Sequence, residues 1–358
     1  MSQRAQRSGS PSTPAMSGNL EQTLGHEPGL AGEQRTAAES SLRLVLMGTG
    51  PFAVPSFEAL RAAGHAIALV VTKPRVEVKS RQGAPPAPVR TWAEEHALPI
   101  FDPASINDPH SVERVAAAKP SLLVVCDYGQ ILKPSALAAA TLGGINLHGS
   151  LLPAYRGAAP VQRALLSGDS ITGVSVIHMT PRLDGGPIMV MRETPIADDE
   201  TAGQLEGRLS ELGIEATLQA VSMLSRWDGN SPMGTVQDPS KVSKAPRLSK
   251  SEGEIDWSKT ARLIDCHIRG MQPWPIAFTY LKHRENKPPV RLAIKHARPT
   301  SQASGGLAPG EIVEGDGLRV ATGDRVIEIT RLQPAGKREM SGDEFLRGHQ
   351  IRPGQRLG

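Results

Sequence analysis

The sequence predicts an α/β fold, with a doubly wound parallel sheet followed by a small β-barrel. Two observations predict the sheet. Apolar runs of about five residues recur between helical stretches, and the first run ends in the turn Gly48-Thr49-Gly50. A third observation predicts the barrel, since short β-type runs alternate with Gly-rich turns after about residue 255. A chain of 358 residues is long enough for two domains.

The elements expected for the first domain follow one another closely along the chain. They are strands at 42–47, 66–72, 99–101, 122–126, 144–148 and 174–179, and helices at 55–63, 88–96, 112–118 and 134–140. Most of the strands are continuous apolar runs, which is typical of strands buried on both faces. Because strands and helices alternate, the sequence predicts a doubly wound parallel sheet.

Changes in composition divide the chain into four parts. Residues 1–41 are rich in Ser, Gly, Gln, Glu and Pro, and we expect them to be disordered. Residues 42–227 are the first folded domain, 228–250 are a polar, Pro- and Lys-containing linker, and 251–358 are the second domain. For the second domain we expect a helix at 258–269 and strands at 277–281, 290–295, 310–313, 318–322 and 326–332.

The charges are unevenly distributed. Residues 241–358 carry 21 Lys and Arg against 13 Asp and Glu, a net charge of +8, whereas residues 1–240 have a net charge of −4. A polyanionic partner and a merely solvated basic face are both compatible with this pattern. A second basic cluster lies at 73–90. It consists of Lys73, Arg75, Lys79, Arg81 and Arg90, opposed by Glu77.

Composition excludes two classes of protein. The sequence has no apolar run of about 18 residues, so a membrane span is not expected. Cys126 and Cys266 are the two cysteines, too few for a disulfide scaffold, and they favour a reducing compartment. No apolar segment typical of a secretory signal follows Arg4 and Arg7.

The first Gly-rich turn matches a dinucleotide-binding fingerprint. The segment from Gly48 to Ala53 fits G-x-G-x-x-A after a strand. That fingerprint requires an acidic residue near the end of the second strand, where this chain has Val71-Thr72-Lys73-Pro74. The sequence therefore favours a tight strand-to-helix turn over an NAD site.

Three polar residues are the candidates for catalysis. Asn146 and His148 lie two apart at the end of a strand, so both side chains leave the same face. An amide and an imidazole on one face can both stabilise a carbonyl oxygen that gains negative charge. Asp184 lies in a Gly-rich turn after the strand at 174–179, and from there it can return to orient His148 and help move a proton. A satisfied histidine and two ordinary turn residues remain the alternative.

Other kinds of site find little support. No Ser stands in G-x-S-x-G, and no set of Cys and His has the spacing of a metal site. We therefore expect no metal.

These residues resemble those of the folate-dependent formyltransferases, and further motifs resemble the branch that acts on methionyl-tRNA. Asn146, His148, Asp184 and the stretch from Ser150 to Pro160 carry the general resemblance. The specific motifs are Leu46 to Ala53, Pro246 to Trp257, Arg269 to Pro275 and Leu332 to Gly348. The resemblance covers residues 42–358 and implies a Rossmann-like N-terminal domain joined to an OB-like barrel.

The resemblance also implies a reaction. We expect transfer of the formyl group of 10-formyltetrahydrofolate to the amino group of methionine on initiator tRNA, with Asn146, His148 and Asp184 as catalytic residues. It further implies that Ser150, Leu151, Leu152 and Pro153 line the folate site, and that 128–131 flank the pterin. The partners expected are the initiator methionyl-tRNA and the folate donor, with no membrane partner, for a cytoplasmic monomer.

Several functions remain as alternatives. A formyltransferase acting on glycinamide ribonucleotide or an amino sugar, or a folate-dependent hydrolase, would share the three polar residues. A nonenzymatic RNA-binding protein with a basic barrel belongs to a different class. The basic C-terminal third and its motifs favour the tRNA enzyme.

Overall fold

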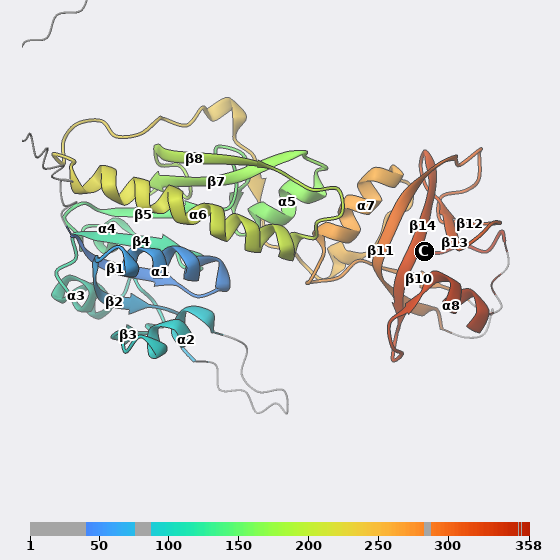
Figure 1. Cartoon of the computed structure of the whole chain (residues 1–358), viewed down its shortest axis with the longest axis horizontal. Coiled ribbons are helices and arrows are strands. Elements are labelled where there is room, and N and C mark those ends of the chain that lie inside the picture. The colour runs from blue at the N-terminus through green and yellow to red at the C-terminus, as the bar shows by residue number, and fades with distance from the viewer. Residues whose placement is uncertain (1–40, 76–86, 283–287, 350, 352) are drawn as a thin grey trace, which may run out of the picture. The chain divides into compact units, whose positions relative to one another are not determined.

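The computed structural model describes residues 41–75, 87–282, 288–349, 351 and 353–358. Within these residues, seven strands form a mixed sheet in the order β3-β2-β1-β4-β5-β7-β8 (Figure 1). The disorder predicted for residues 1–40 lies outside the described residues, and so do Glu77, Lys79 and Arg81 of the basic cluster at 73–90. Ser41 is described, and its hydroxyl donates to the Gly64 carbonyl at 2.8 Å.

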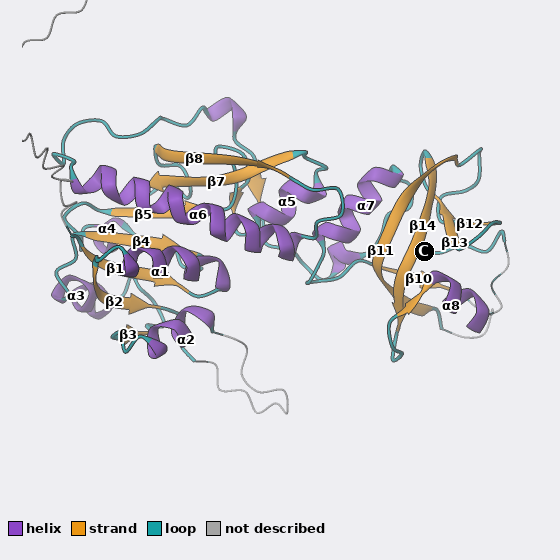
Figure 2. Cartoon of the chain, in the orientation of Figure 1, coloured by secondary structure: helices purple, strands orange, loops and turns teal. Residues whose placement is uncertain are grey.

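Strands and helices alternate along the first domain up to β5, and Figure 2 distinguishes the two kinds of element by colour. The strands are β1 (Arg43–Gly48), β2 (Ala66–Val71), β3 (Ile100–Phe101), β4 (Leu122–Cys126), β5 (Gly144–His148), β7 (Ile171–His178) and β8 (Ile188–Pro195). The helices are α1 (Val54–Ala62), α2 (Pro88–Glu95), α3 (Pro109–Ala117), α4 (Pro134–Leu137), α5 (Pro160–Leu166) and α6 (Ala202–Ser225), with a 3-10 turn η1 (Pro51–Ala53). Each expected strand and helix is found, with ends that shift by a few residues.

The sheet is buried on both faces, which explains its unbroken apolar runs. Leu44 and Leu46 of β1 join the core on the side of α1, α2, α5 and α6. Val45 and Met47 point the other way, into the core that contains residues of α3 and α4. Since successive side chains of a strand leave opposite faces, a strand covered on both sides needs apolar residues at every position.

The last two strands differ from a purely parallel sheet. β1 to β5 are parallel, whereas β7 pairs antiparallel with β5 and β8 pairs antiparallel with β7. The α/β fold class is confirmed, but the sheet is mixed. Because His178 at the end of β7 pairs with Ile145, the loop after β7 starts beside the amino half of β5. That loop must fold back over the sheet to bring Asp184 to His148.

The second domain is an antiparallel sheet of the expected kind. Within the described residues, its strands follow the order β10-β11-β14-β13-β12, and β15 pairs with β14. The strands are β10 (Phe278–Leu281), β11 (Val290–Ala303), β12 (Ile312–Val313), β13 (Leu318–Ala321), β14 (Arg325–Pro334) and β15 (Met340–Ser341), and the helices are α7 (Ala261–Gly270) and α8 (Gly342–Gly348). Bridges Leu281↔Leu357 and Glu311↔Arg356 tie the C-terminal residues to both edges of this sheet.

The segment between the two domains has regular secondary structure and pairs with the first domain. It contains the 3-10 turns η2 (Pro239–Lys241) and η3 (Ser251–Gly253) and the strand β9 (Lys244–Ala245). β9 pairs in parallel with β6 (Arg156–Gly157), which lies between β5 and α5 in the sequence. The predicted linker is thus hydrogen-bonded to the first domain. None of the described helices is long and apolar enough to cross a bilayer.

Candidate active site

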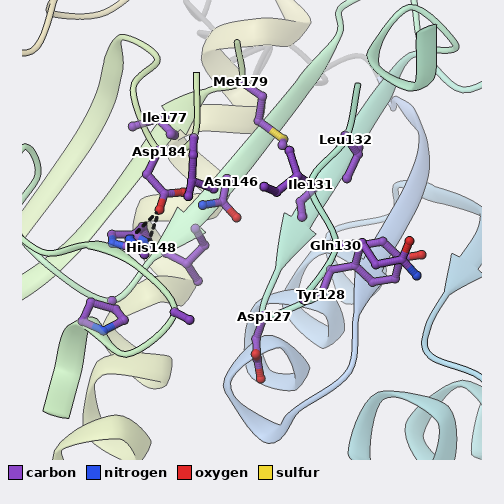
Figure 3. A pocket seen from close by; sticks show the side chains of 18 of the residues that line it. Asp127, Tyr128, Gln130, Ile131, Leu132, Asn146, His148, Ile177, Met179 and Asp184 are labelled. Atoms are coloured by element: carbon purple, nitrogen blue, oxygen red, sulfur yellow. Dashed lines mark hydrogen bonds and ion pairs between the residues drawn. The ribbon is translucent and has the colours of Figure 1, made fainter. Parts of the chain in front are cut away.

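A cavity of about 400 Å³ opens where β4 and β5 end (Figure 3). A volume of this size suits a small-molecule ligand. Residues that follow β2, β4, β5, β7 and β9 line it, together with Glu206 of α6. The cavity therefore lies at the carboxyl ends of parallel strands, where open α/β sheets bind their ligands.

Asn146 and His148 reach the cavity from the same strand, as their spacing predicts. Figure 3 shows both side chains on one side of the cavity, close to Asp184. His148 is only 6% exposed, and its Nε2 lies 2.9 Å from the Tyr155 carbonyl oxygen. A carbonyl can only accept a hydrogen bond, so Nε2 carries the proton in this contact. In the neutral ring, Nδ1 is then an acceptor facing Asp184 and the cavity.

Asp184 completes the group that the sequence predicted. Its Oδ2 accepts from the Gly157 backbone N–H at 2.9 Å and lies 3.9 Å from His148 Nδ1. Its backbone has a positive φ of 47°, a conformation that Asp tolerates better than most residues. The distance of 3.9 Å exceeds a direct hydrogen bond, so a donor that bonds to both acceptors would have to lie to one side of them, toward the cavity. The structure therefore brings Asn146, His148 and Asp184 together.

Ser150 to Pro153, which the resemblance assigns to the folate site, lie outside the lining of this cavity. None of these four residues is among the residues that line the cavity. Ser150 is fully buried, its hydroxyl donates to the Ala154 carbonyl, and its own carbonyl accepts from Ser175 Oγ at 2.7 Å. The same Ser175 Oγ accepts from the Leu152 N–H at 3.0 Å. Hydrogen bonds with Ser175 thus hold this stretch against β7. Its position alone does not indicate a direct contact with folate.

The first Gly-rich turn faces a carboxylate instead of a space for a dinucleotide. The Thr49 N–H donates to the Asp127 carbonyl at 3.1 Å, and the Gly50 N–H donates to the Asp127 side chain. A Cβ placed on Gly50 would lie 1.9 Å from Asp127 Oδ2. The place where helix-terminal N–H groups would meet a pyrophosphate is therefore taken by a negative charge of the protein. This geometry supports the tight-turn interpretation of the motif.

Asp127 belongs to a charged group on the cavity wall that the sequence analysis did not find. Glu206, Lys73 and Arg247 share the wall with it. Desolvation raises the pKa of both carboxyl groups, and Asp127 raises the pKa of Glu206 further by repulsion. Lys73 and Arg247 act in the opposite direction on the pKa of Asp127. These four residues come from four separate elements, so no local sequence pattern connects them.

A mainly apolar wall faces Asn146, His148 and Asp184. Ile131 is 59% exposed, and with Leu132 and Met179 it borders the cavity. Gly129 and Gln130 also line this wall. Burial raises the pKa of Tyr128 to about 12, which keeps its hydroxyl neutral. In the described part of the chain, no group of three or more His, Cys, Asp or Glu is arranged to hold a metal ion.

Comparisons with known proteins identify the family. Residues 42–221 match the family model of formyl transferase, and residues 247–350 match the model of the formyl transferase C-terminal domain. A curated methionyl-tRNA formyltransferase of Rhodopirellula baltica is 61% identical over 332 residues, covering 91% of this chain and 99% of the relative. The chain belongs to the methionyl-tRNA formyltransferase family.

Other relatives of this formyltransferase agree in sequence and fold. The methionyl-tRNA formyltransferase of Methylococcus capsulatus is 40% identical and covers 88% of this chain and 100% of its own length. The N-formyltransferase of Helicobacter canadensis, solved in complex with folinic acid and dTDP-3-aminofucose, has a TM-score of 0.59 at 17% identity. It covers 80% of this chain and 99% of its own, and it supports the fold alone.

One more residue of this formyltransferase lies against the site without having been predicted. Gln237, in the linker, donates from Nε2 to the Asp184 carbonyl at 2.8 Å and to the Gly186 carbonyl at 2.7 Å. It lies 53 residues beyond Asp184, in a stretch without apolar periodicity. A polar residue in such a stretch is ordinarily solvated, so the sequence carries no signal for this contact.

Proposed function

We propose that this enzyme transfers the formyl group of 10-formyltetrahydrofolate to the amino group of methionine on initiator tRNA. The observation that carries the proposal is the convergence of Asn146, His148 and Asp184 on one cavity. Membership of the methionyl-tRNA formyltransferase family selects the acceptor among the reactions that such a site supports.

The three residues have separate roles in this reaction. When the amine attacks, the formyl oxygen gains negative charge, and the Asn146 amide, which lines the cavity, can donate to it. His148, anchored through Nε2, has Nδ1 available to accept the proton that the amine releases. Asp184 lies at ion-pair distance from the ring and balances the charge that the ring then carries. When the tetrahedral intermediate collapses, the bond between the formyl carbon and the folate nitrogen breaks, and the proton held by His148 passes to that nitrogen, so that tetrahydrofolate leaves and the ring is neutral again.

The cavity suits a folate donor. Folate supplies an activated formyl group on a weakly basic nitrogen, with an aromatic ring system to be held beside it. Ile131, Leu132 and Met179 provide apolar surface opposite the polar residues, and the 128–131 backbone is the proposed pterin wall. Ser150 to Pro153 support the loop behind the site, and their direct contact with folate stays a prediction.

In this proposal, one domain binds folate and carries out the transfer, and the other binds the tRNA. We propose 42–227 as the catalytic domain, 228–250 as a linker and 251–358 as the tRNA-binding domain. The basic excess of residues 241–358 supports this division, because Lys and Arg neutralise backbone phosphates. A dispensable segment 1–41, a monomeric state and a location in the cytoplasm stay predictions from the sequence.

A comparison of acceptors tests the proposed function. The full chain is mixed with radiolabelled 10-formyltetrahydrofolate and one acceptor: initiator methionyl-tRNA, uncharged tRNA, glycinamide ribonucleotide, an amino-sugar nucleotide, or water. We expect label in formylmethionyl-tRNA alone. Preferred labelling of a small-molecule amine, or release of formate at the same rate without tRNA, would replace the proposed acceptor. RNA binding without any transfer would indicate a nonenzymatic protein.

A further inference from the structure

The linker is hydrogen-bonded to the loop that carries Asp184. Gln237 is 6% exposed, although it lies in a segment whose neighbours are exposed. Its Nε2 donates to the carbonyls of Asp184 and Gly186, and its Oε1 accepts from Arg156 Nε at 3.1 Å and Nη2 at 2.6 Å. One buried amide therefore connects the Asp184 loop to strand β6.

The same segment holds the loop that anchors His148. The Tyr155 N–H donates to Ser243 Oγ at 2.8 Å, and the Arg156 N–H donates to the Ser243 carbonyl at 2.9 Å. Ala158 and Ala159 donate their N–H groups to the Ala245 carbonyl. Since the Tyr155 carbonyl accepts from His148 Nε2, the linker reaches both sides of the His148–Asp184 pair.

The packing between these segments leaves little freedom. Gly157 has a φ of 129°, and a Cβ there would lie 2.5 Å from the Ala245 carbonyl oxygen. The Gly157 N–H is also the donor that holds Asp184 Oδ2. A displacement of the linker would therefore move a hydrogen-bond donor of the catalytic carboxylate as well as its backbone.

We propose that residues 237–245 of the linker position the catalytic loops from outside the cavity, with Gln237 as the positioning residue of Asp184. The proposal rests on the proposed function, because it assigns Asp184 a part in formyl transfer. Gln237 touches no reacting atom and acts through Asp184. Its amide is suited to this place because the two carbonyls need a donor and the Arg156 guanidinium needs an acceptor.

Two substitutions separate the parts of this contact. Gln237→Met removes both the donor and the acceptor at similar length. Gln237→Glu keeps an acceptor for Arg156 but, when ionised, offers no donor to the two carbonyls. We expect both to lower kcat by about 10- to 100-fold, because small displacements of a catalytic group have large kinetic effects. KM for folate and for tRNA should change little. Wild-type kcat in either folded variant would overturn the proposal.

A matched control comes from α6. Gln219 also accepts from an arginine, Arg192, at 2.6 Å, but it lies on an exposed surface. Gln219→Met should leave kcat at the wild-type value. A decrease equal to that of Gln237→Met would mean that disrupting any Gln–Arg pair has the same effect, and would overturn the specific role of Gln237.

A double-mutant cycle distinguishes positioning from general support of the fold. If Gln237 acts through Asp184, Gln237→Met should lower kcat strongly in the wild type and by less than about threefold in the Asp184→Asn background. An equal fold-change in both backgrounds would show that Gln237 acts independently of Asp184, which overturns the proposal.

Amide exchange tests the positioning without relying on activity. The Gly157 N–H is protected by Asp184 Oδ2, so hydrogen exchange at this amide should become faster in Gln237→Met and Gln237→Glu and stay unchanged in Gln219→Met. Unchanged exchange in the Gln237 variants would overturn the proposal even if the enzyme is active. If exchange is faster in the Gln237 variants but the wild-type chain forms no formylmethionyl-tRNA, the positioning contact would stand and the proposed function would be refuted.

Discussion

The imidazole of His148 is held through one ring nitrogen, and its other ring nitrogen faces Asp184. Nε2 is held by the Tyr155 carbonyl at 2.9 Å, so the ring cannot turn without breaking this bond in a nearly dry environment. Nδ1 faces Asp184 at 3.9 Å, and Asn146 lies on the same face of β5. The fixed ring places the acceptor, the carboxylate and the amide donor around one point.

Substitution of these residues should affect turnover far more than stability. We expect His148→Ala and Asp184→Asn each to lower kcat by about 10²- to 10⁴-fold, the usual range for general acid–base groups. Asn146→Ala should lower kcat by about 10²- to 10³-fold through removal of an oxyanion donor. Saturating transfer assays and thermal unfolding by circular dichroism measure the two effects. Near-normal kcat in a folded variant would remove that residue from the mechanism.

A second residue-scale prediction concerns Glu58 of α1. Hydrogen bonds from Arg61 and Trp92 lower the pKa of Glu58 to about 2. His96 Nε2 also lies 3.5 Å from the same carboxylate. A carboxyl whose pKa is lower in the folded than in the unfolded state stabilises folding above its usual pKa of 4.5, and this stabilisation disappears as pH falls towards 2.

Glu58→Gln should therefore lower the free energy of unfolding at neutral pH and not near pH 2. Because the Glu58 side chain is 39% exposed, the difference at neutral pH should be below about 1 kcal/mol. Urea unfolding at several pH values measures it. Glu211→Gln, at an exposed position of α6, serves as the control for removal of one carboxylate. A difference between wild type and Glu58→Gln that stays constant across the whole acidic range would contradict the expected linkage.

At the scale of elements, the antiparallel edge of the sheet shapes the site. β5 supplies Asn146 and His148, and β7 pairs with β5 so that His148 faces Ser175. The β7–β8 connection then returns with Asp184, and Gln237 holds it by its backbone. α6 covers this edge and begins with a capping box in which Thr201 and Gln204 satisfy each other's backbone groups.

Two glycines in these elements should respond to alanine in opposite directions. Gly207 lies in α6 with no heavy atom within 4 Å of an added Cβ, so Gly207→Ala should stabilise by about 0.5–1 kcal/mol through helix propensity. Gly173 lies in β7, where a Cβ would be 2.0 Å from the Arg192 carbonyl oxygen of β8. Gly173→Ala should destabilise by at least about 1–3 kcal/mol. Chemical denaturation measures the free energy of unfolding of both variants. A stabilised Gly173→Ala would show that β7 and β8 separate easily.

At the scale of the whole molecule, the positive charge is concentrated in and after the linker. Lys241, Lys244 and Lys250 are exposed and do not line the cavity, whereas Arg247 does. The first three can therefore be changed without removing a charge from the cavity wall. This separation allows RNA binding and folate binding to be tested independently.

Reversing the charge of Lys241, Lys244 and Lys250 to Glu should weaken tRNA binding and flatten its dependence on salt. The slope of log K against log salt should fall by about 0.7–0.9 for each phosphate that the protein no longer neutralises. Binding of tetrahydrofolate should stay unchanged, and so should tRNA binding by the control variant that combines Arg114→Glu with Lys133→Glu. Titrations at several salt concentrations decide the matter. An unchanged slope would show that these lysines do not contact RNA.

The sequence predicts β1 to β5, β7 and α1 to α4 in order, and it predicts the shared face of Asn146 and His148, for a local reason. It did not predict β8, α5 or α6. Residues 42–47 and 122–126 are mostly apolar because both faces of their strands are covered, and that pattern is readable without a structure. The spacing of Asn146 and His148 is likewise a property of one strand. Asp184 needed the additional assumption that its loop returns to the sheet, and the structure shows that it does.

What the sequence determined by itself was the α/β class, the order of the strands and helices that it predicted, the sign of the charge in each part and the shared face of Asn146 and His148. Only the tertiary structure decided that Asp127 faces the first turn, that Ser150 to Pro153 lie outside the cavity lining and that Gln237 holds the Asp184 loop. The physical reason is the separation along the chain of the residues that are in contact. Periodicity within an element specifies which side chains share a face, whereas contacts between loops depend on which strands pair and in which direction.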